Sequence, residues 1–391
     1  RRVKLDRAVN KSFALGVTAS SIDVKKSIKV KHLELTSTEE NIDINAPIDV
    51  ANDMISTSQQ ETINHGQAIK VGKDYTGKAK GDYKNIDGTI DVKAMAEIEG
   101  ASVISQRSDQ NHHAGISADT LSIQSTKKDV VTNDTLTGRT CLDINAKRDV
   151  KAECLVYSVQ GKHDVMHPSL PAVLSGGKGT EATRGYGASV KAGNKVKIHA
   201  STLESTGHNY IKGKKGVDIS GRVDGYVSHR ETKSSLLKKT CTEETTIDVY
   251  GANVISHQGR NEIDTEQSVD VHSGNLLSKQ GTVMRGKNIK MDGVKATKTK
   301  SVSKSKFFGL SKSSSTIKQE QIIPNYIYDE GHSEIHAENS VNVTDTIIDG
   351  PGGGRGDLTV TGQDINISCN KLTSTIETKK SGVSISLFGM K

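Results

Sequence analysis

Carboxylates recur along the chain at spacings that could place them side by side in a groove. Asp23 and Asp43 are twenty residues apart, and Asp248 and Asp270 form a second pair at a similar spacing. Clustered carboxylates are the catalytic groups of enzymes that hydrolyse polysaccharides, so a β-helical carbohydrate-active enzyme (a polysaccharide lyase or hydrolase) is one hypothesis. The same aspartates belong to a regular apolar–polar alternation, as on a solvated sheet face. We favour this structural interpretation and predict that the chain is not an enzyme.

Other polar motifs have the residue types of metal or phosphate sites but not the spacing. His163 and His167 are four residues apart and His112 and His113 are adjacent, yet neither pair comes with the helix or the carboxylates that would support a zinc site. The segment "SGGKGT" at 175–180 does not have the spacing of a P-loop. No two of the four cysteines are spaced as metal ligands. We therefore predict no cofactor, no metal and no catalytic residue.

A glycine-rich segment is a candidate for cell adhesion. The stretch "GPGGGRGDLTV" contains Arg355, Gly356 and Asp357, a tripeptide that some adhesins present to integrins. The glycines around it predict an exposed turn. The alternative is an insertion loop in which the tripeptide has no role. Both interpretations place the segment in a loop.

The composition indicates a thin, elongated core of small branched side chains that excludes aromatic residues. The 391 residues include 37 Gly and 5 Pro but no Trp, and aromatics make up 3% of the chain. The net charge of +7 is compatible with anionic lipid or heparin-like anionic glycans as partners, while the lack of aromatics between basic residues argues against nucleic acid. No apolar run approaches the roughly 18 residues of a membrane-spanning helix. The chain starts without Met, so we expect an internal fragment of a longer protein.

Stretches of twenty residues repeat almost without gaps. In this alignment Val30, Val50, Val130 and Val150 share one column, and the aligned stretches are 21–40, 41–60, 121–140 and 141–160. Apolar–polar–apolar triplets such as "IDV" predict short strands with one buried face. Three short strands per turn of about twenty residues predict an all-β fold, a right-handed parallel β-helix in which each turn is buried by its neighbours.

The repeats predict a single β-solenoid over residues 1–391 with interruptions. Regular turns are expected at about 21–160 and 188–372, and Ile247, Val269 and Ile289 are expected to share a column. Serine- and lysine-rich excursions, formed as loops or hairpins, are expected at about 1–20, 161–187, 226–245, 296–330 and 373–391.

All four phenylalanines lie in these excursions. Phe307 and Phe308 are part of "TKTKSVSKSKFFGLSKSSS", which also contains Leu310, and Phe388 is part of "VSISLFG". One interpretation is that these apolar residues pack against the stacked turns. The other is that they contact a membrane or a partner, because an apolar edge flanked by cations is attracted to anionic lipid.

Twenty-residue β-helical turns combined with recurring Ser/Lys-rich segments that contain Phe-Gly resemble the haemagglutinin-repeat region of filamentous haemagglutinin-like bacterial exoproteins, which include the effectors of contact-dependent growth inhibition. The stretch "TKTKSVSKSKFFGLSKSSS", followed by "SEIHAENSVNVTD", carries most of this resemblance. The resemblance implies export by two-partner secretion through an outer-membrane transporter, and a filament at the bacterial cell surface. It implies an adhesin or a toxin-delivery protein that associates with the outer membrane of a target cell. No secretion domain, receptor-binding segment or toxin domain is recognised in the sequence.

Overall fold

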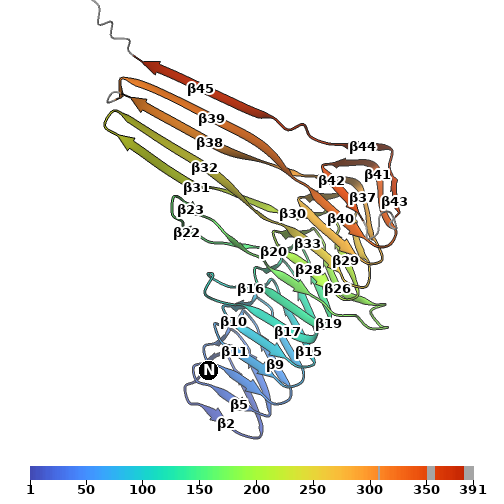
Figure 1. Cartoon of the computed structure of the whole chain (residues 1–391). Helices are drawn as coiled ribbons and strands as arrows, with labels where there is room; N and C mark the ends of the chain where they lie inside the picture. The colour runs from blue at the N-terminus through green and yellow to red at the C-terminus, as the bar shows by residue number, and fades with distance from the viewer. Residues whose placement is uncertain (307–308, 350–356, 383–391) are drawn as a thin grey trace, which may run out of the picture.

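The computed structural model describes residues 1–306, 309–349 and 357–382 (Figure 1). Within these residues, 36 strands form one large sheet and five strands form a separate antiparallel sheet, with two further two-stranded pairs. The strands of the large sheet pair in parallel along its whole length. The prediction of an all-β fold with a large parallel sheet is therefore confirmed.

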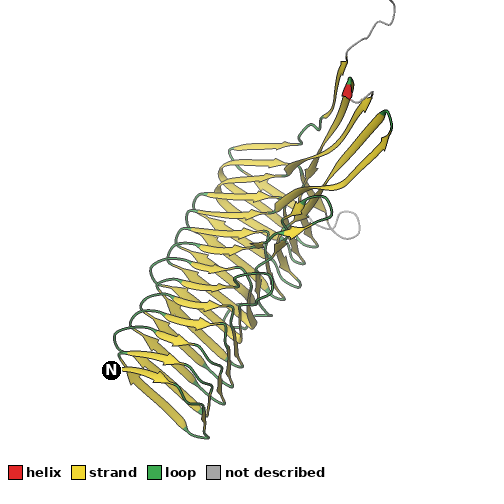
Figure 2. Ribbon diagram, turned by 90° about the vertical axis from the view of Figure 1, so that its left-hand side faces the viewer, coloured by secondary structure: helices red, strands yellow, loops and turns green. Residues whose placement is uncertain are grey.

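The strands of the large sheet fall into three columns, and the chain passes through them repeatedly in the same order (Figure 2). We define one pass through the first, second and third columns as a turn. Each strand pairs with the equivalent strand of the next turn, so Ile28 and Val30 in one turn lie beside Ile48 and Val50 in the next. Such stacking satisfies the backbone hydrogen bonds of every inner turn.

The bounds of the strands follow from this order. The first column contains β2 (Val9–Asn10), β5 (Ile28–Val30), β8 (Ile48–Val50), β11 (Ala68–Val71), β14 (Thr89–Val92), the first halves of β17 (Gly115–Ser125) and β19 (Thr135–Ala146), β25 (Val173–Ser175), β28 (Thr202–Ser205), β33 (Ala252–Ser256), β36 (Gly274–Ser278), β40 (Asn325–Asp329) and β42 (Thr346–Asp349). The second contains β3 (Ala14–Ala19), β6 (His32–Ser37), β9 (Met54–Ser58), β12 (Tyr75–Ala79), β15 (Met95–Gly100), the second halves of β17 and β19, β26 (Tyr186–Ala192), β29 (His208–Gly213), β34 (Asn261–Thr265), the first halves of β37 (Thr282–Asp292) and β41 (Ser333–Thr344), and β43 (Leu358–Thr361). The third contains β1 (Arg2–Leu5), β4 (Ser21–Val24), β7 (Ile42–Ile44), β10 (Thr62–His65), β13 (Tyr83–Ile86), β16 (Val103–Gln106), β18 (Val130–Thr132), β20 (Val150–Glu153), β27 (Lys195–His199), β30 (Gly216–Ser220), β35 (Ser268–His272), the second halves of β37 and β41, and β44 (Asp364–Ser368). The remaining strands are β21 (Leu155–Val156), β22 (Val159–Gln160), β23 (Val165–Met166), β24 (Ser169–Leu170), β31 (Arg222–Ser235), β32 (Lys238–Tyr250), β38 (Val294–Lys306), β39 (Ser311–Ile323) and β45 (Ser374–Gly382).

The apolar residues of the repeat form a continuous buried core. Val30 pairs with Val50 in the first column and Val130 pairs with Val150 in the third, and all four side chains are at most 3% exposed. The two pairings are as predicted, but the prediction that all four valines share one column is wrong, because strands of different columns have the same apolar–polar–apolar alternation. Because strand residues alternate between the two faces of a sheet, each apolar–polar–apolar triplet buries two side chains. Burying one such side chain contributes about 1.5–3 kcal/mol relative to leaving it exposed, and this contribution recurs in every turn.

Two tyrosines contradict the expectation that the core excludes aromatic residues. Tyr75 and Tyr83 are fully buried, and their hydroxyl oxygens lie 2.6 Å apart. The Tyr75 hydroxyl also lies 2.8 Å from Oγ of Ser56. Burial raises the pKa of Tyr83 well above its ordinary value. Gly77 provides room for the rings, since a Cβ there would lie 2.7 Å from the Tyr75 hydroxyl.

Two predictions about the boundaries of the repeat are wrong. Residues 1–20 are not an excursion, because β1, β2 and β3 pair with β4, β5 and β6 as a regular turn. Val269 does pair with Ile289, but Ile247 does not belong to this column, and its place is taken by Val217. Ile247 lies in antiparallel β32, and an antiparallel strand has the same apolar–polar alternation as a parallel one.

Excursions leave the stack at one corner, between the third and the first columns, and at every second turn. They follow β16, β20, β30, β37 and β44, whereas the turns between them cross this corner with one or two residues. Ala200, Ser273 and Asp345 occupy three of these short corners with φ of 42°, 51° and 50°. This left-handed conformation is unfavourable for residues other than glycine, and it allows the chain to reverse within a single residue.

The predicted excursions therefore leave the stack, but with different boundaries and mostly as strands. The excursion at 226–245 lies in the long antiparallel pair β31–β32, and that at 296–330 lies in the pair β38–β39 except for its end, which returns to the first column as β40. The described part of 373–391 contains β45, which pairs with β39. Of the excursion at 161–187, residues 173–175 return to the first column as β25 and residues 186–187 begin β26. The predicted run of regular turns at 21–160 is also wrong in part, because residues 107–114 leave the stack after β16, and β21 and β22 belong to the excursion that follows β20.

Candidate functional site: the lysine-rich end of the antiparallel sheet

The long hairpins join into one antiparallel sheet that projects from the side of the stack (Figure 1). Its strand order is β31-β32-β38-β39-β45, so three segments far apart in the sequence form one surface. Serine and threonine dominate these strands and alternate with lysine, which leaves both faces polar. The register places Thr240 between Lys233 and Lys304 on one face, so lysines recur across the sheet.

Positive charge is concentrated at the end of this sheet that is farthest from the stack. We define residues 233–241, 303–306, 309–313 and 378–382 as the lysine tip; they contain no Asp or Glu and eight lysines, which are Lys233, Lys238, Lys239, Lys304, Lys306, Lys312, Lys379 and Lys380. Lys238 lies directly opposite Lys306. Like charges in opposite positions destabilise a sheet, and a bound anion would relieve this repulsion.

The base of the same sheet differs from the tip, because it contains acidic residues that pair with several of its cations. Arg230 lies 2.7 Å from Glu243, and Lys300 lies 2.7 Å from Glu244. Lys300 lowers the pKa of Glu244 from its ordinary value. Lys233 pairs with Glu231 at the boundary of the tip. Within the described part of the chain, the other seven tip lysines have no ion-pair partner.

One face of the tip forms a shallow cavity of about 640 Å³. A row of directly opposed residues crosses it, in the order Thr232, Cys241, Ser303, Ser314 and Lys379. Hydroxyl groups can donate hydrogen bonds, and an ammonium group has three donors and no acceptor. This combination suits a ligand that carries several anionic oxygen atoms.

Exposed apolar residues lie beyond the lysines, in the connections between the strands. Leu236 and Leu237 connect β31 to β32 and are 86% and 46% exposed, and Leu310, just before β39, is 49% exposed. Exposed leucines next to unpaired lysines form an amphipathic end to the sheet. Leu236 and Leu237 were not among the predicted contact residues, although the sequence "SSLLKK" has the same combination of apolar and cationic residues as the segments that contain phenylalanine.

The structure places only part of the predicted contact residues. Leu310 lies at the lysine tip, as described above. Asp357 is exposed and directly precedes β43 in the large sheet, where its carbonyl oxygen accepts a hydrogen bond from the Ser333 amide. These two residues therefore belong to different sheets. The other predicted residues lie outside the described residues; they are Phe307, Phe308, Phe388, Arg355 and Gly356.

The structure brings together one of the two predicted aspartate pairs, Asp23 and Asp43, which line a shallow cavity of about 380 Å³ together with Glu40. Asp23 and Asp43 are in register, but Asp23 accepts a hydrogen bond from Asn45 and Asp43 contacts His65. The second pair is split between the two sheets, because Asp248 lies in β32 and Asp270 lies in β35. The sequence could not reveal this separation, since both residues follow the same alternation.

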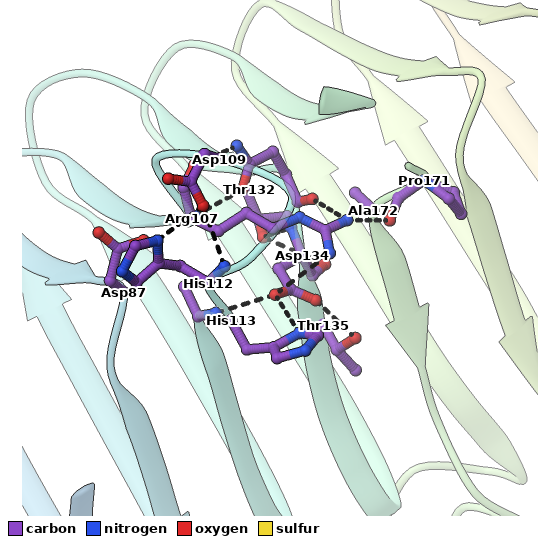
Figure 3. Close-up of polar contacts among 12 residues, drawn as sticks. Asp87, Arg107, Asp109, His112, His113, Thr132, Asp134, Thr135, Pro171 and Ala172 are labelled. Carbon is purple, nitrogen blue, oxygen red and sulfur yellow. Dashed lines mark hydrogen bonds and ion pairs between the residues drawn. The ribbon is translucent and has the colours of Figure 1, made fainter. Parts of the chain in front are cut away.

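The histidines singled out from the sequence have structural partners. His112 lies 2.6 Å from Asp109, which raises the pKa of His112, while this hydrogen bond lowers the pKa of Asp109 (Figure 3). His113 lies 3.6 Å from Asp134, whose carboxylate is 3.8 Å from the guanidinium of Arg107. Among the described residues, no group of three or more His, Cys, Asp or Glu is arranged to hold a metal ion.

Arg107 connects two successive excursions. Its side chain is 6% exposed, and its guanidinium donates to the carbonyl oxygens of Asn133 and Pro171, each at 3.3 Å (Figure 3). Pro171 belongs to the excursion that follows β20, two turns after the excursion that begins at Arg107. The cluster in Figure 3 therefore ties excursions to each other and to the short corner between them.

Comparisons with protein-family models, with curated proteins and with solved structures found no match. In the described residues, no helix is long and apolar enough to cross a membrane.

Proposed function

We propose that this chain is a structural stalk segment of a secreted bacterial filament, exported by two-partner secretion, and that its lysine tip contacts the anionic surface of a target-cell outer membrane. The turns would form a right-handed β-helix. The observation that carries the proposal is the lysine tip, in which seven unpaired lysines and three exposed leucines project away from the stack. The parent protein would be an adhesin or a toxin-delivery protein.

The regularity of the stack supports the role of a stalk. Each turn contains the same three strands, and the buried apolar side chains form one core cluster that runs from Ala19 to Val343. The alternative, a β-helical carbohydrate-active enzyme, requires converging carboxylates. It is disfavoured because the aspartate pairs predicted from the sequence either have other partners or lie in different sheets.

The expected affinity for a membrane is moderate. A lysine close to an anionic bilayer contributes roughly 1 kcal/mol, so four lysines that reach the surface at once would contribute about 4 kcal/mol. Burying an exposed leucine side chain contributes about 1.5–3 kcal/mol. With one or two inserted leucines, the sum is about 6–10 kcal/mol, which corresponds to dissociation constants from roughly 0.1 mM to below 1 μM.

Vesicle binding by the full chain tests the proposal. The probe is a vesicle of phosphatidylcholine with phosphatidylglycerol, compared with pure phosphatidylcholine, at low and at high salt. We expect binding only to the anionic vesicles, weakened by salt. Replacement of Lys238, Lys239, Lys304 and Lys306 by Gln should abolish most of it, and Leu236→Ser/Leu237→Ser should reduce it roughly tenfold.

The matched control removes four exposed lysines from the stack, which are Lys70, Lys78, Lys80 and Lys93. If this control variant loses as much binding as the tip variant, net charge alone drives binding and the role of the tip is refuted. Phe307→Ser/Phe308→Ser in the same assay tests the contact residues predicted from the sequence. A secretion assay with the cognate outer-membrane transporter tests the proposed export route separately.

A further inference from the structure

A second concave surface lies on the second column of the stack, and its lining residues differ in chemical character from those of the lysine tip. It is a groove of about 500 Å³ lined by residues of four successive turns. Asp143, Ser189, Tyr210 and Glu262 are in register along it. Neighbouring strands are about 4.8 Å apart, so this row is about 14 Å long. The groove is therefore long enough for a ligand of several repeating units.

Aromatic rings form one wall of the groove. Tyr186 packs edge-to-face against Tyr210, with ring centroids 5.8 Å apart, and against His208 at 5.5 Å. Both tyrosines are partly exposed, in contrast to Tyr75 and Tyr83, which are fully buried in the core. A tyrosine ring offers an apolar face together with a polar hydroxyl. Such a wall fits a ligand that is apolar on its faces and polar at its edges.

The polar groups of the groove are held in fixed positions. The Tyr186 hydroxyl donates to one carboxylate oxygen of Glu262 at 2.6 Å, and Arg260 donates to the other. Asp264 lies 3.6 Å from Arg285. Burial and the neighbouring carboxylate of Asp264 raise the pKa of Tyr210 to about 12. The Tyr210 hydroxyl is therefore neutral over the physiological pH range, and its proton is directed to the Asp264 carboxylate.

The charges of the groove balance, in contrast to those of the lysine tip. Glu262 and Asp264 are each compensated by an arginine, and the remaining lining charges are Asp143 and Lys191, one of each sign. An anion would meet the carboxylates and a cation would meet Lys191 and the two arginines. A neutral ligand with many hydroxyl groups avoids both penalties and can use the fixed donors and acceptors.

From this geometry we infer that the groove binds a neutral oligosaccharide, with a pyranose ring packed on Tyr210 or Tyr186 and its hydroxyls bonded to the surrounding carboxylates and hydroxyls. Hydrolysis is not part of the inference, because both oxygens of Glu262 are already bound. The inference does not depend on the proposed membrane contact, and it assigns a separate ligand to a separate surface of the stalk.

Ligand-observed NMR with the full chain tests this inference, because saturation transfer detects weak binding directly. The probes are cellotetraose, maltotetraose and chitotetraose, with a heparin-derived tetrasaccharide as the anionic comparison. We expect at least one neutral probe to bind with a dissociation constant in the micromolar to millimolar range. Tyr210→Ala should weaken binding at least tenfold, and Tyr186→Phe, which removes only the hydroxyl bound to Glu262, should weaken it less.

The matched control is Tyr326→Ala, which removes a tyrosine that is 43% exposed but lies in β40, outside the groove. Circular dichroism establishes that each variant is folded. The inference is overturned if no neutral probe binds at 10 mM, if Tyr326→Ala weakens binding as much as Tyr210→Ala, or if only the heparin fragment binds. None of these outcomes bears on vesicle binding by the lysine tip.

Discussion

Replacement of Gly77 by alanine should loosen the stack around its two buried tyrosines. An alanine Cβ at this position would lie 2.7 Å from the Tyr75 hydroxyl and 2.9 Å from Cε2 of Tyr83, well inside the separation at which nonbonded atoms attract. Both rings are fully buried and their hydroxyls are hydrogen-bonded to each other. One ring must therefore move, and this hydrogen bond must lengthen or break.

The size of the effect follows from three contributions. Overpacking of a close-packed core costs about 1–3 kcal/mol, and the loss of the hydrogen bond between the hydroxyls costs about 1 kcal/mol more. The replacement of glycine by alanine returns about 0.4–1 kcal/mol, because it lowers the entropy of the unfolded chain. We therefore expect the variant to destabilise this part of the stack by about 1–3 kcal/mol.

Hydrogen exchange of the full chain measures this change locally. Because each turn contacts only its neighbours, the loss of protection should be confined to β12, β13 and the strands that pair with them. A change of 1.4 kcal/mol is a factor of ten, so exchange in these strands should be roughly 5- to 100-fold faster. Strands β34, β35 and β36 should exchange as in the parent chain.

Gly16→Ala is the matched control for this variant. Gly16 also lies in a second-column strand, β3, but no protein atom lies within 4 Å of the position that its Cβ would take. Its replacement should leave protection unchanged or raise it slightly. If Gly77→Ala leaves the hydrogen-exchange protection of β12 and β13 unchanged, as Gly16→Ala is expected to leave that of β3, the rings have free space and the packing argument is wrong.

Two further perturbations test the stack and the cluster of Figure 3. Val130→Asp would bury a charge without a partner and should cost several kcal/mol; proteolysis should then cleave near β18, and cleavage spread evenly along the chain would contradict local coupling. The contact with Asp109 raises the pKa of His112 above 6.5, the ordinary pKa of histidine. The contact therefore stabilises the loop fully below pH 6.5, and this contribution is lost as the pH rises through the pKa of His112 in the folded protein. An NMR titration should give a midpoint for His112 above 6.5, and Asp109→Asn should lower it; an unchanged midpoint would refute the contact.

The sequence was sufficient to predict which residues of adjacent turns pair, because register in a repeat is set by the buried residues. It was not sufficient to assign a strand to its column, because the strands of all three columns have the same alternation. A shift of one residue would move Val30 and Val50 from the core to the surface, so the spacing of valines determines which residues pair. The tyrosine pair was not predictable in the same way. Its burial depends on a glycine in the same strand and on a serine in the preceding turn, Ser56, and none of these is apolar.

The lysine tip was only partly predictable from the sequence. The excursions were recognisable because their lysine and serine content differs from that of the turns. Their assembly into one sheet depends on the pairing of β32 with β38 and of β39 with β45. These strands lie outside the repeat, so an alignment of the turns does not indicate that they pair. The groove around Tyr210 is a similar case, because its residues come from four turns of unequal length.

The spacing of the excursions accounts for the continuity of the antiparallel sheet. Strands in a sheet are about 4.8 Å apart, so two turns advance the corner by about 9.6 Å, which is the width that a two-stranded hairpin occupies. Because the long hairpins leave after β30 and β37 and β45 follows β44, each at every second turn, the strands of successive excursions come within hydrogen-bonding distance. A hairpin at every turn would be crowded, whereas a hairpin at every third turn would leave unpaired edges. The alternation thus joins polar insertions from separate turns into one continuous sheet, which brings lysines from three distant segments onto the same surface.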